Sequence, residues 1–323
     1  MLYFETGSTD PAYNLAFEEY VLTHWTVGDI LILWQNDNAV IIGRNQNTAE
    51  EINQSFVDTH GIHVVRRNTG GGAVYHDLGN LNYSFITDEG ASRNAFTQPV
   101  VRALCDLGMD AEASGRNDIL VSGKKVSGTA QQISKGRILH HGTLLFDSDS
   151  NMISGALTPD PGKYQSKGVK SVRSRVGNIR AFLQQDMTIT AFWAHLKRTL
   201  GDAGMVEAQL TAEELAQVEK LKAEKYDTWQ WNYGRSPAYD TQVKRRFSGG
   251  TLDVRLTVKQ GVIAQIKFYG DFLAVSPVHI LEEALLGCEY RREAIQQTLS
   301  GLPVEACLGG ITAEECMQTI LNI

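Results

Sequence analysis

The sequence predicts an α+β protein with a mixed or largely antiparallel sheet, followed by a small C-terminal α+β domain. Short strand patterns and helical patterns are interspersed along most of the chain, which favours this class. Near the C-terminus, two alternating runs flank a turn, as in a hairpin with one buried face. With 323 residues, 42% of them hydrophobic and 21% charged, the chain has a globular composition and the length for two domains.

The first half of the chain opens with a helix signal. Asp10 before Pro11 is an N-cap with proline at the first helical position, which predicts a helix over residues 11–24. A second helix is expected at 98–108. Short apolar runs predict strands at 29–34, 39–42, 63–67 and 81–87.

The second half is predicted to contain scaffold helices and then the small domain. Helices are expected at 188–200 and 211–225, and another is expected to begin within 277–286. A boundary within 229–239 divides the chain into a larger domain, 1–235, and an accessory domain, 236–323. The accessory hairpin turns at Gln260 and Gly261, and its alternating apolar positions are Leu252, Val254, Leu256, Val258, Val262, Ala264, Ile266 and Phe268.

Charge and composition argue against several classes of protein. The net charge of −7 does not favour a nucleic-acid partner. The N-terminus lacks a basic segment followed by an apolar core, and no apolar run approaches a membrane span, so we expect a cytoplasmic protein without a membrane partner. The cysteines lack a CxxC pair, which favours small buried side chains over a disulfide framework or zinc site; they are Cys105, Cys288, Cys307 and Cys316.

The densest signal for a ligand site is RRNTGGGAVYHDLGNLNYSF, residues 66–85. Three consecutive glycines, Gly70 to Gly72, let backbone amides approach a ligand closely and point together at an anion. Arg67 beside them could add a charge-assisted contact to phosphate or carboxylate. Taken alone, a triple glycine is more often a flexible turn, and the segment matches neither common nucleotide-binding loop.

The second signal is GRNDILVSGKKVSGTA, residues 115–130. Residues 119–121 and 125–127 are predicted to form a hairpin turned at Ser122 and Gly123, which would present Asn117, Asp118 and the lysines at one end of a sheet. Because neighbouring strand residues face opposite ways, Lys124 and Lys125 must differ. The pattern does not decide which one faces a ligand, and a solvated lysine pair is the simpler interpretation.

Two weaker signals follow. LHHGTLLFD, residues 139–147, contains His140 and His141 without carboxylate or cysteine at metal-ligand spacing, so we interpret both as hydrogen-bonding wall residues. Between Pro161 and Arg180 the chain carries six cations and no acid, a local excess in a negatively charged protein; these are Lys163, Lys167, Lys170, Arg173, Arg175 and Arg180.

Together these segments resemble the lipoate–protein ligase A family. The resemblance covers nearly the whole chain and also includes DPAYNLAFEEY, LWQNDNAVIIGRNQN, SVRSRV and WQWNYGRSPAY. It implies a catalytic domain of the biotin and lipoate ligase fold with a C-terminal accessory domain. It also implies ATP-dependent activation of lipoate to lipoyl-AMP with Mg²⁺, and transfer of the lipoyl group to a lysine of an acceptor. The implied acceptors are lipoyl domains of 2-oxoacid dehydrogenase E2 subunits or the glycine cleavage H protein.

The resemblance also assigns residues. Lys125, before VSG, would be the catalytic lysine, and Mg²⁺ would be carried mainly by phosphate with Asp118 as a candidate ligand. The implied nucleotide-binding residues are Arg67, Gly72, Ala73, Val74, Tyr75, Asn117, Asp118 and Lys125. The implied lipoate-binding residues are Thr69, Gly70, Gly71, Gly72, His76, Lys125 and His141. The loop over the adenylate would contain Lys163, Lys167, Ser174 and Arg175. For the apolar tunnel of the dithiolane we suggest Leu15, Val74 and Phe85.

Three alternatives remain open at this point. An ATP-independent octanoyl or lipoyl transferase would work through a cysteine thioester, and no cysteine falls within the signal segments. A biotin ligase would show a GRGRxGR loop, whereas this chain has only GRNQN, residues 43–47. A non-enzymatic protein that binds lipoyl domains would lose nucleotide binding, which the intact glycine and lysine segments argue against.

Overall fold

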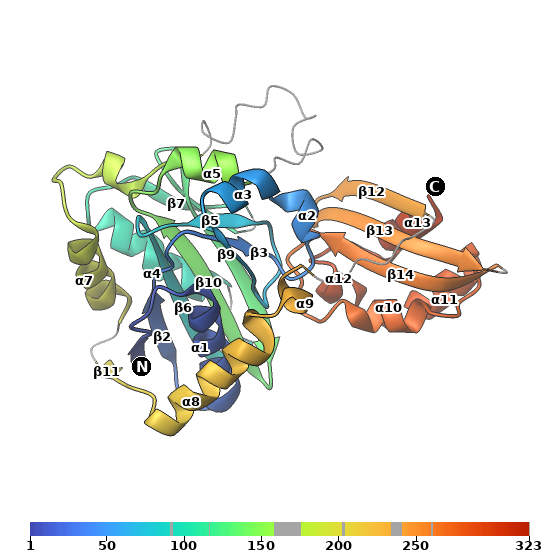
Figure 1. The fold of residues 1–323 in the computed structure, drawn as a ribbon, viewed down its shortest axis with the longest axis horizontal. Coiled ribbons are helices and arrows are strands. Elements are labelled where there is room, and N and C mark those ends of the chain that lie inside the picture. Colours follow the sequence, from blue (N-terminus) through green and yellow to red (C-terminus); the bar gives the residue numbers. More distant parts are fainter. Residues whose placement is uncertain are drawn as a thin grey trace.

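The computed structural model describes residues 1–90, 93–115, 117–157, 176–201, 204–233, 241–259 and 261–322. Figure 1 shows a larger N-terminal lobe beside a smaller C-terminal lobe; their described residues are those up to 233 and those from 241 onward. Within these described ranges, no helix is both long and apolar enough to cross a bilayer.

A mixed sheet forms the centre of the N-terminal lobe, with eight strands among the described residues. Their spatial order is β11 (Val206–Glu207), β1 (Leu2–Glu5), β2 (Ile30–Trp34), β6 (Asn80–Asp88), β10 (Arg137–Leu145), β9 (Lys124–Ser134), β8 (Asp118–Val121) and β7 (Ala111–Ser114). Strand β1 runs parallel to both neighbours, and the remaining pairs are antiparallel. The predicted α+β class with a mixed sheet is confirmed.

Helices cover both faces of this sheet (Figure 1). Helices α1 (Pro11–His24) and α8 (Ala212–Leu221) pack on one face, and α4 (Arg93–Cys105) and α7 (Ile189–Leu200) on the other. Strand β2 sends alternate side chains into both clusters, which explains its unbroken apolar sequence.

The helix predictions hold with two changes. The Asp10 carboxylate accepts the Ala12 N–H at 2.9 Å, so the predicted N-cap of α1 is confirmed. Helix α4 begins at Arg93 rather than at residue 98, and Pro99 lies inside it. After α8, a π-helical turn, η3 (Lys222–Tyr226), carries the chain on, so the region predicted as one helix is two elements.

A second, three-stranded sheet holds the glycine segment. Its order is β4 (His63–Arg66), β3 (Ala39–Ile42) and β5 (Val74–His76), so residues 67–73 form the connection from one edge strand to the other. We call residues 67–73 the glycine loop. Short helical elements complete the N-terminal lobe: α2 (Thr48–Glu51), α3 (Gln54–Thr59), α5 (Ser150–Ala156), η2 (Ile179–Phe182) and α9 (Trp229–Asn232).

The C-terminal lobe has its own sheet and its own core. Strands β12 (Thr241–Phe247), β13 (Gly250–Lys259) and β14 (Val262–Gly270) form an antiparallel sheet, and the helices that cover it are α10 (His279–Leu285), α11 (Arg292–Leu299), α12 (Val304–Cys307) and α13 (Ala313–Leu321). The predicted hairpin is confirmed, but its alternation is wrong at one position. A bulge between Thr257 and Val258 shifts the register, so Ile263 is buried and Ala264 is exposed.

Candidate functional site

A cavity of about 950 Å³ lies between the two sheets of the N-terminal lobe and the edge of the C-terminal lobe. The N-terminal lobe lines it with Leu15, Trp34, Ile41, Arg67, Gly71, Gly72, Ala73, Val74, His76, Asn82, Gly115, Asn117, Asp118, Lys125, Gly128, Thr129, Ala130, His141, Gly142 and Thr143. The C-terminal lobe adds Arg246, Asp271 and Leu273. Segments more than two hundred residues apart in the sequence therefore share one wall.

Most residues predicted for the site meet in this cavity. Those that line it are Arg67, Gly71, Gly72, Ala73, Val74, His76, Asn117, Asp118, Lys125 and His141. Three others, Thr69, Gly70 and Tyr75, are not among the lining residues. The adenylate-loop positions Lys163, Lys167, Ser174 and Arg175 lie outside the described residues.

The Lys125 ammonium lies 2.7 Å from the Asp118 carboxylate, and both side chains are partly exposed to the cavity. Ser122 and Gly123 both have positive φ, as the predicted tight turn between β8 and β9 requires. Pairing then skips Val126, because Leu120 pairs with Lys125 and Ile119 with Ser127. This bulge breaks the alternation that we used to compare the two lysines. Lys124 lies instead against Gly177. A Cβ added to Gly177 would stand 2.9 Å from the Cβ of Lys124.

Arg67 braces the glycine loop rather than projecting into the cavity as a free cation. Its guanidinium donates to the Thr69 hydroxyl at 3.0 Å and to the carbonyls of Ile41, Gly70 and Gly72 at 3.1, 2.7 and 2.8 Å. Burial lowers the pKa of Arg67 to about 10, so the side chain stays charged at neutral pH. The predicted nucleotide contact of Arg67 stays a prediction, since four of its five N–H groups are already used within the protein.

Close backbone approach explains two of the glycines. Gly71 has φ of +93°, which favours glycine, and a Cβ on Gly43 would stand 1.9 Å from the Gly71 carbonyl oxygen. Gly70 has a different neighbour from the one we predicted. A Cβ there would meet the Phe272 carbonyl oxygen at 2.5 Å, so Gly70 packs against the C-terminal lobe instead of lining the substrate cavity.

A chain of buried polar groups runs behind the cavity. The His141 ring lies 2.9 Å from the Glu18 carboxylate through Nδ1 and 2.8 Å from the Thr69 hydroxyl through Nε2. Ser84 also donates to Glu18, and Trp34 donates to Ser84. Thr69 therefore contributes by orienting His141. Only one residue of the predicted histidine pair is a wall residue, because His140 points to the opposite face and stacks on Phe96.

Three other predicted residues have distinct surroundings. Burial is the main cause that lowers the pKa of His76 to about 3, and the charge of Arg67 is the next. The His76 ring is therefore neutral at the cavity wall. The Tyr75 hydroxyl turns away to Asn38, at 3.1 Å, and burial raises its pKa to about 12. Leu15 and Val74 line the cavity as suggested, but Phe85 packs in the core against Phe96 instead.

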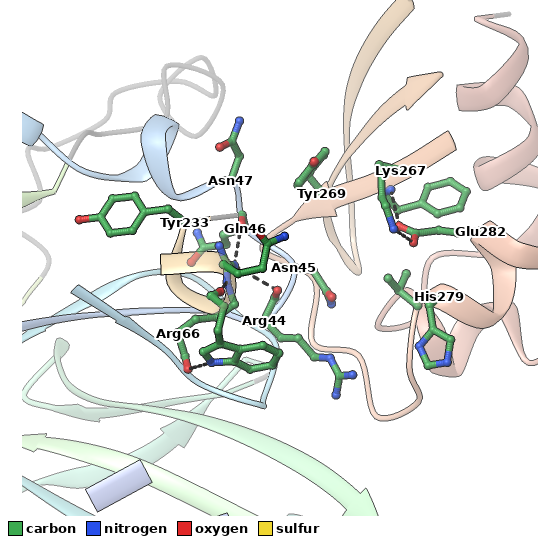
Figure 2. A pocket seen from close by; sticks show the side chains of 14 residues that line it. Arg44, Asn45, Gln46, Asn47, Arg66, Tyr233, Lys267, Tyr269, His279 and Glu282 are labelled. Carbon is green, nitrogen blue, oxygen red and sulfur yellow. Dashed lines mark hydrogen bonds and ion pairs between the residues drawn. The ribbon is translucent and has the colours of Figure 1, made fainter. Parts of the chain in front are cut away.

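A smaller cavity, of about 250 Å³, lies at the junction of the lobes and is drawn in Figure 2. On one side Arg66 fastens the 43–46 segment by donating to the carbonyls of Gly43, Arg44 and Gln46. On the other side Lys267 is paired with Glu282. No residue predicted for the site lines this cavity, so we assign the candidate site to the larger one.

Sequence reasoning missed several residues of the cavity lining and also Glu18, which lies behind it. Asn82 follows the apolar Leu81 in a buried strand, and Glu18 is an acid among the buried positions of α1; a polar residue at such a place was the available signal. No comparable signal pointed to Arg246, Asp271 and Leu273, because their position depends on how the two lobes pack.

The described ranges contain neither a metal site formed by protein side chains alone nor a cysteine in the cavity wall. These residues contain no group of three or more His, Cys, Asp or Glu side chains that could hold a metal ion by themselves. None of the free thiols lines the cavity: Cys105 is near the end of α4, and Cys288, Cys307 and Cys316 are in the C-terminal lobe. A thioester mechanism at this site would lack its nucleophile.

The chain belongs to the lipoyl protein ligase family. The family model for the lipoyl protein ligase A/B catalytic domain matches residues 10–201, and the model for the bacterial lipoate protein ligase C-terminus matches residues 236–320. The chain is 46% identical to lipoate–protein ligase LplJ of Bacillus subtilis over 99% of its own length and 100% of that protein.

Two solved structures agree with this assignment. P. falciparum LipL1 in complex with lipoate matches with a TM-score of 0.80 and 25% identity, covering 100% of this chain and 99% of that one. A lipoate–protein ligase A bound with ATP matches with a TM-score of 0.62 and 31% identity, covering 72% of this chain and 97% of that one.

Proposed function

We propose that this protein is an ATP-dependent lipoate–protein ligase and that the 950 Å³ cavity is its catalytic centre. The observation that carries the proposal is the convergence of Lys125 and the glycine loop on one cavity. The family membership and the ATP-bound relative support the reaction class. Residues 1–235 would form the catalytic domain and 236–323 the accessory domain.

In the first step, a lipoate carboxylate oxygen attacks the α-phosphorus of ATP. The bond from that phosphorus to the bridging oxygen breaks, and pyrophosphate leaves with its electron pair, so that lipoyl-AMP remains. Both reactants are anionic, and the site must hold them in line and offset their repulsion. Lys125 supplies a positive charge on a strand, and the amides of Gly72 and Ala73 in the same cavity lining would supply donors.

The donor set fits a magnesium ion held largely by the nucleotide. Mg²⁺ usually binds one or two carboxylates together with substrate phosphates, and Asp118 provides one carboxylate in the cavity. When bound there, the ion would shield phosphate charge. Asp118 also orients the Lys125 ammonium through their 2.7 Å contact.

In the second step, a neutral lysine amine of the acceptor attacks the acyl carbon of lipoyl-AMP. The bond to the phosphate oxygen breaks, AMP leaves, and the new amide loses a proton to solvent. Lys125 would polarise the carbonyl during this step. We propose E2 lipoyl domains or the H protein as acceptors.

The apolar part of the wall suits the lipoate tail. Leu15, Trp34, Ile41 and Val74 gather on the side formed by α1 and the strands β2, β3 and β5. A mostly apolar pocket with a few convergent polar groups is the usual form of a small-molecule site. The cavity volume is ample for a fatty acid beside a nucleotide.

The test is to incubate the purified protein with ATP, Mg²⁺ and lipoate and to analyse the products by mass. We expect lipoyl-AMP and pyrophosphate, and a lipoylated acceptor when a lipoyl domain is added. Acceptor modification without ATP would identify an acyltransferase instead. Tight binding of the lipoyl domain without any adenylate would favour a non-enzymatic binding protein.

A further inference from the structure

We infer that Asn14 and Asn36 hold the proton of His76 on Nε2, so that His76 offers the acyl substrate an uncharged N–H donor. Calling that ligand an acyl substrate rests on the proposed function, but the proton assignment does not. Asn36 and Asn14 act as positioning residues, since Asn36 contacts the ring and neither asparagine lines the cavity.

Backbone carbonyls orient the side-chain amide of Asn14, in helix α1. One atom of its side-chain amide lies 3.1 Å from the Ser8 carbonyl oxygen and 2.8 Å from the Gln35 carbonyl oxygen. Carbonyl oxygens only accept hydrogen bonds, so this atom must be the NH₂ nitrogen, Nδ2. The orientation of the Asn14 amide is therefore determined by the backbone.

The orientation of the Asn14 amide fixes the orientation of the Asn36 amide. Asn14 Nδ2 is also 2.9 Å from the Asn36 side chain. An NH₂ nitrogen cannot accept, so the facing Asn36 atom is the acceptor Oδ1, and the two hydrogens of Asn14 Nδ2 are shared among three oxygens. The other end of the Asn36 amide, Nδ2, then faces His76 Nδ1 at 3.1 Å. Because Nδ2 is a donor, Nδ1 must accept, and the proton of a neutral imidazole is left on Nε2.

The surroundings of His76 disfavour the charged form of its ring and leave the Nε2–H donor without an acceptor among the described residues. His76 is 3% exposed, and Arg67 and His141 are the nearby groups whose charges oppose protonation. Nε2 is buried and has no hydrogen-bond partner among the described residues. Since His76 lines the substrate cavity, a ligand oxygen or sulfur can satisfy this donor.

An uncharged donor suits both half-reactions. It can donate to the lipoate carboxylate and to the acyl adenylate alike, and it need not change protonation state between them. This differs from Lys125, whose charge acts on developing negative charge.

The first test needs no variant. In full-length protein labelled with ¹⁵N-histidine, the His76 signals, assigned by their loss in His76→Gln, should report a proton on Nε2 and should shift when lipoate alone is added. A proton on Nδ1 would overturn the inference, and so would unchanged His76 signals with calorimetrically verified lipoate binding. If lipoate fails to bind at all, the proposed function fails while the tautomer result still stands.

The second test reverses the donor. Asn36→Asp is nearly isosteric but offers His76 only an acceptor, so the proton should move to Nδ1 and the KM for lipoate should rise by about tenfold. Asn53→Asp, at the N-cap of α3 where aspartate caps equally well, is the control and should leave KM unchanged. His76→Gln, which keeps an N–H donor, should retain more activity than His76→Ala. An unchanged KM in a folded Asn36→Asp protein would contradict the ligand contact.

Discussion

Arg67 and Lys125 are both cations that line the cavity, but they make different contacts. The Arg67 guanidinium donates to the backbone carbonyls of Ile41, Gly70 and Gly72. These hydrogen bonds hold the glycine loop in place. Lys125 is paired with Asp118 and keeps part of its surface in the cavity. A sequence pattern finds both cations, but the hydrogen bonds that separate their roles depend on the folded loop.

His76 makes stability depend on pH. Its pKa falls from an unfolded value of about 6.5 to about 3, so the unfolded chain binds the extra proton between these values. The stabilisation is present above pH 6.5 and is lost as the pH falls toward 3. Between pH 7.5 and pH 5.0 the wild-type free energy of unfolding should drop by about 2 kcal/mol more than that of His76→Gln.

Urea unfolding at the two pH values provides the measurement. His63→Gln, an exposed position, is the matched control and should behave as the wild type. Equal drops in wild type and His76→Gln would show that the buried ring does not carry this effect.

At the scale of elements, the periodicity of the sequence predicts strands well and predicts bulges poorly. The β8–β9 and β13–β14 hairpins follow from alternation and turn residues. The skipped residues Val126 and Ala264 do not, because a bulge changes the phase of the side chains without changing the composition of the strand. The choice of Lys125 over Lys124 therefore came from the family resemblance and not from strand parity.

The contact between Gly43 and the glycine loop provides an element-scale prediction. In Gly43→Ala the new Cβ would stand 1.9 Å from the Gly71 carbonyl oxygen, a backbone atom that cannot rotate away. We expect the loop to be displaced and lipoate or ATP affinity to fall by at least about tenfold. Isothermal titration measures this directly.

Gly61→Ala separates that clash from the general cost of replacing a glycine. Gly61 has φ of +59° but open space around it, so its replacement strains the backbone by about 1 kcal/mol without touching the loop. Similar ligand affinity in both variants would mean that the Gly43 contact does not shape the site.

At the scale of the whole molecule, the C-terminal lobe completes the cavity. The Gly71 N–H donates to the Phe272 carbonyl at 3.2 Å, and the Gly270 N–H donates to the Asn45 carbonyl at 2.7 Å. The two lobes are thus joined through the glycine loop and the 43–47 segment, next to the junction cavity of Figure 2. Local patterns predict each lobe, but these contacts join residues too distant in the sequence for any local pattern to reveal.

Arg246 tests whether this lobe takes part in the chemistry. It lies in the cavity wall, where Asp271 holds its guanidinium at 2.9 Å, and a nearby triphosphate would attract it. Arg246→Ala should slow lipoyl-AMP formation by about tenfold and leave lipoate affinity unchanged. Lys244→Ala, the same loss of charge on the same strand but outside the cavity wall, is the control. Equal rates in both variants would limit the lobe to a structural role.

We propose that Lys125, which lines the same cavity as the glycine loop, drives adenylation of lipoate. It is tested most directly by lipoate-dependent pyrophosphate release in wild type, Lys125→Ala and Lys124→Ala, with folding checked by thermal melting. We predict that release is abolished in Lys125→Ala and retained in Lys124→Ala, since only Lys125 lines the cavity. Wild-type release from a folded Lys125→Ala protein would contradict the account.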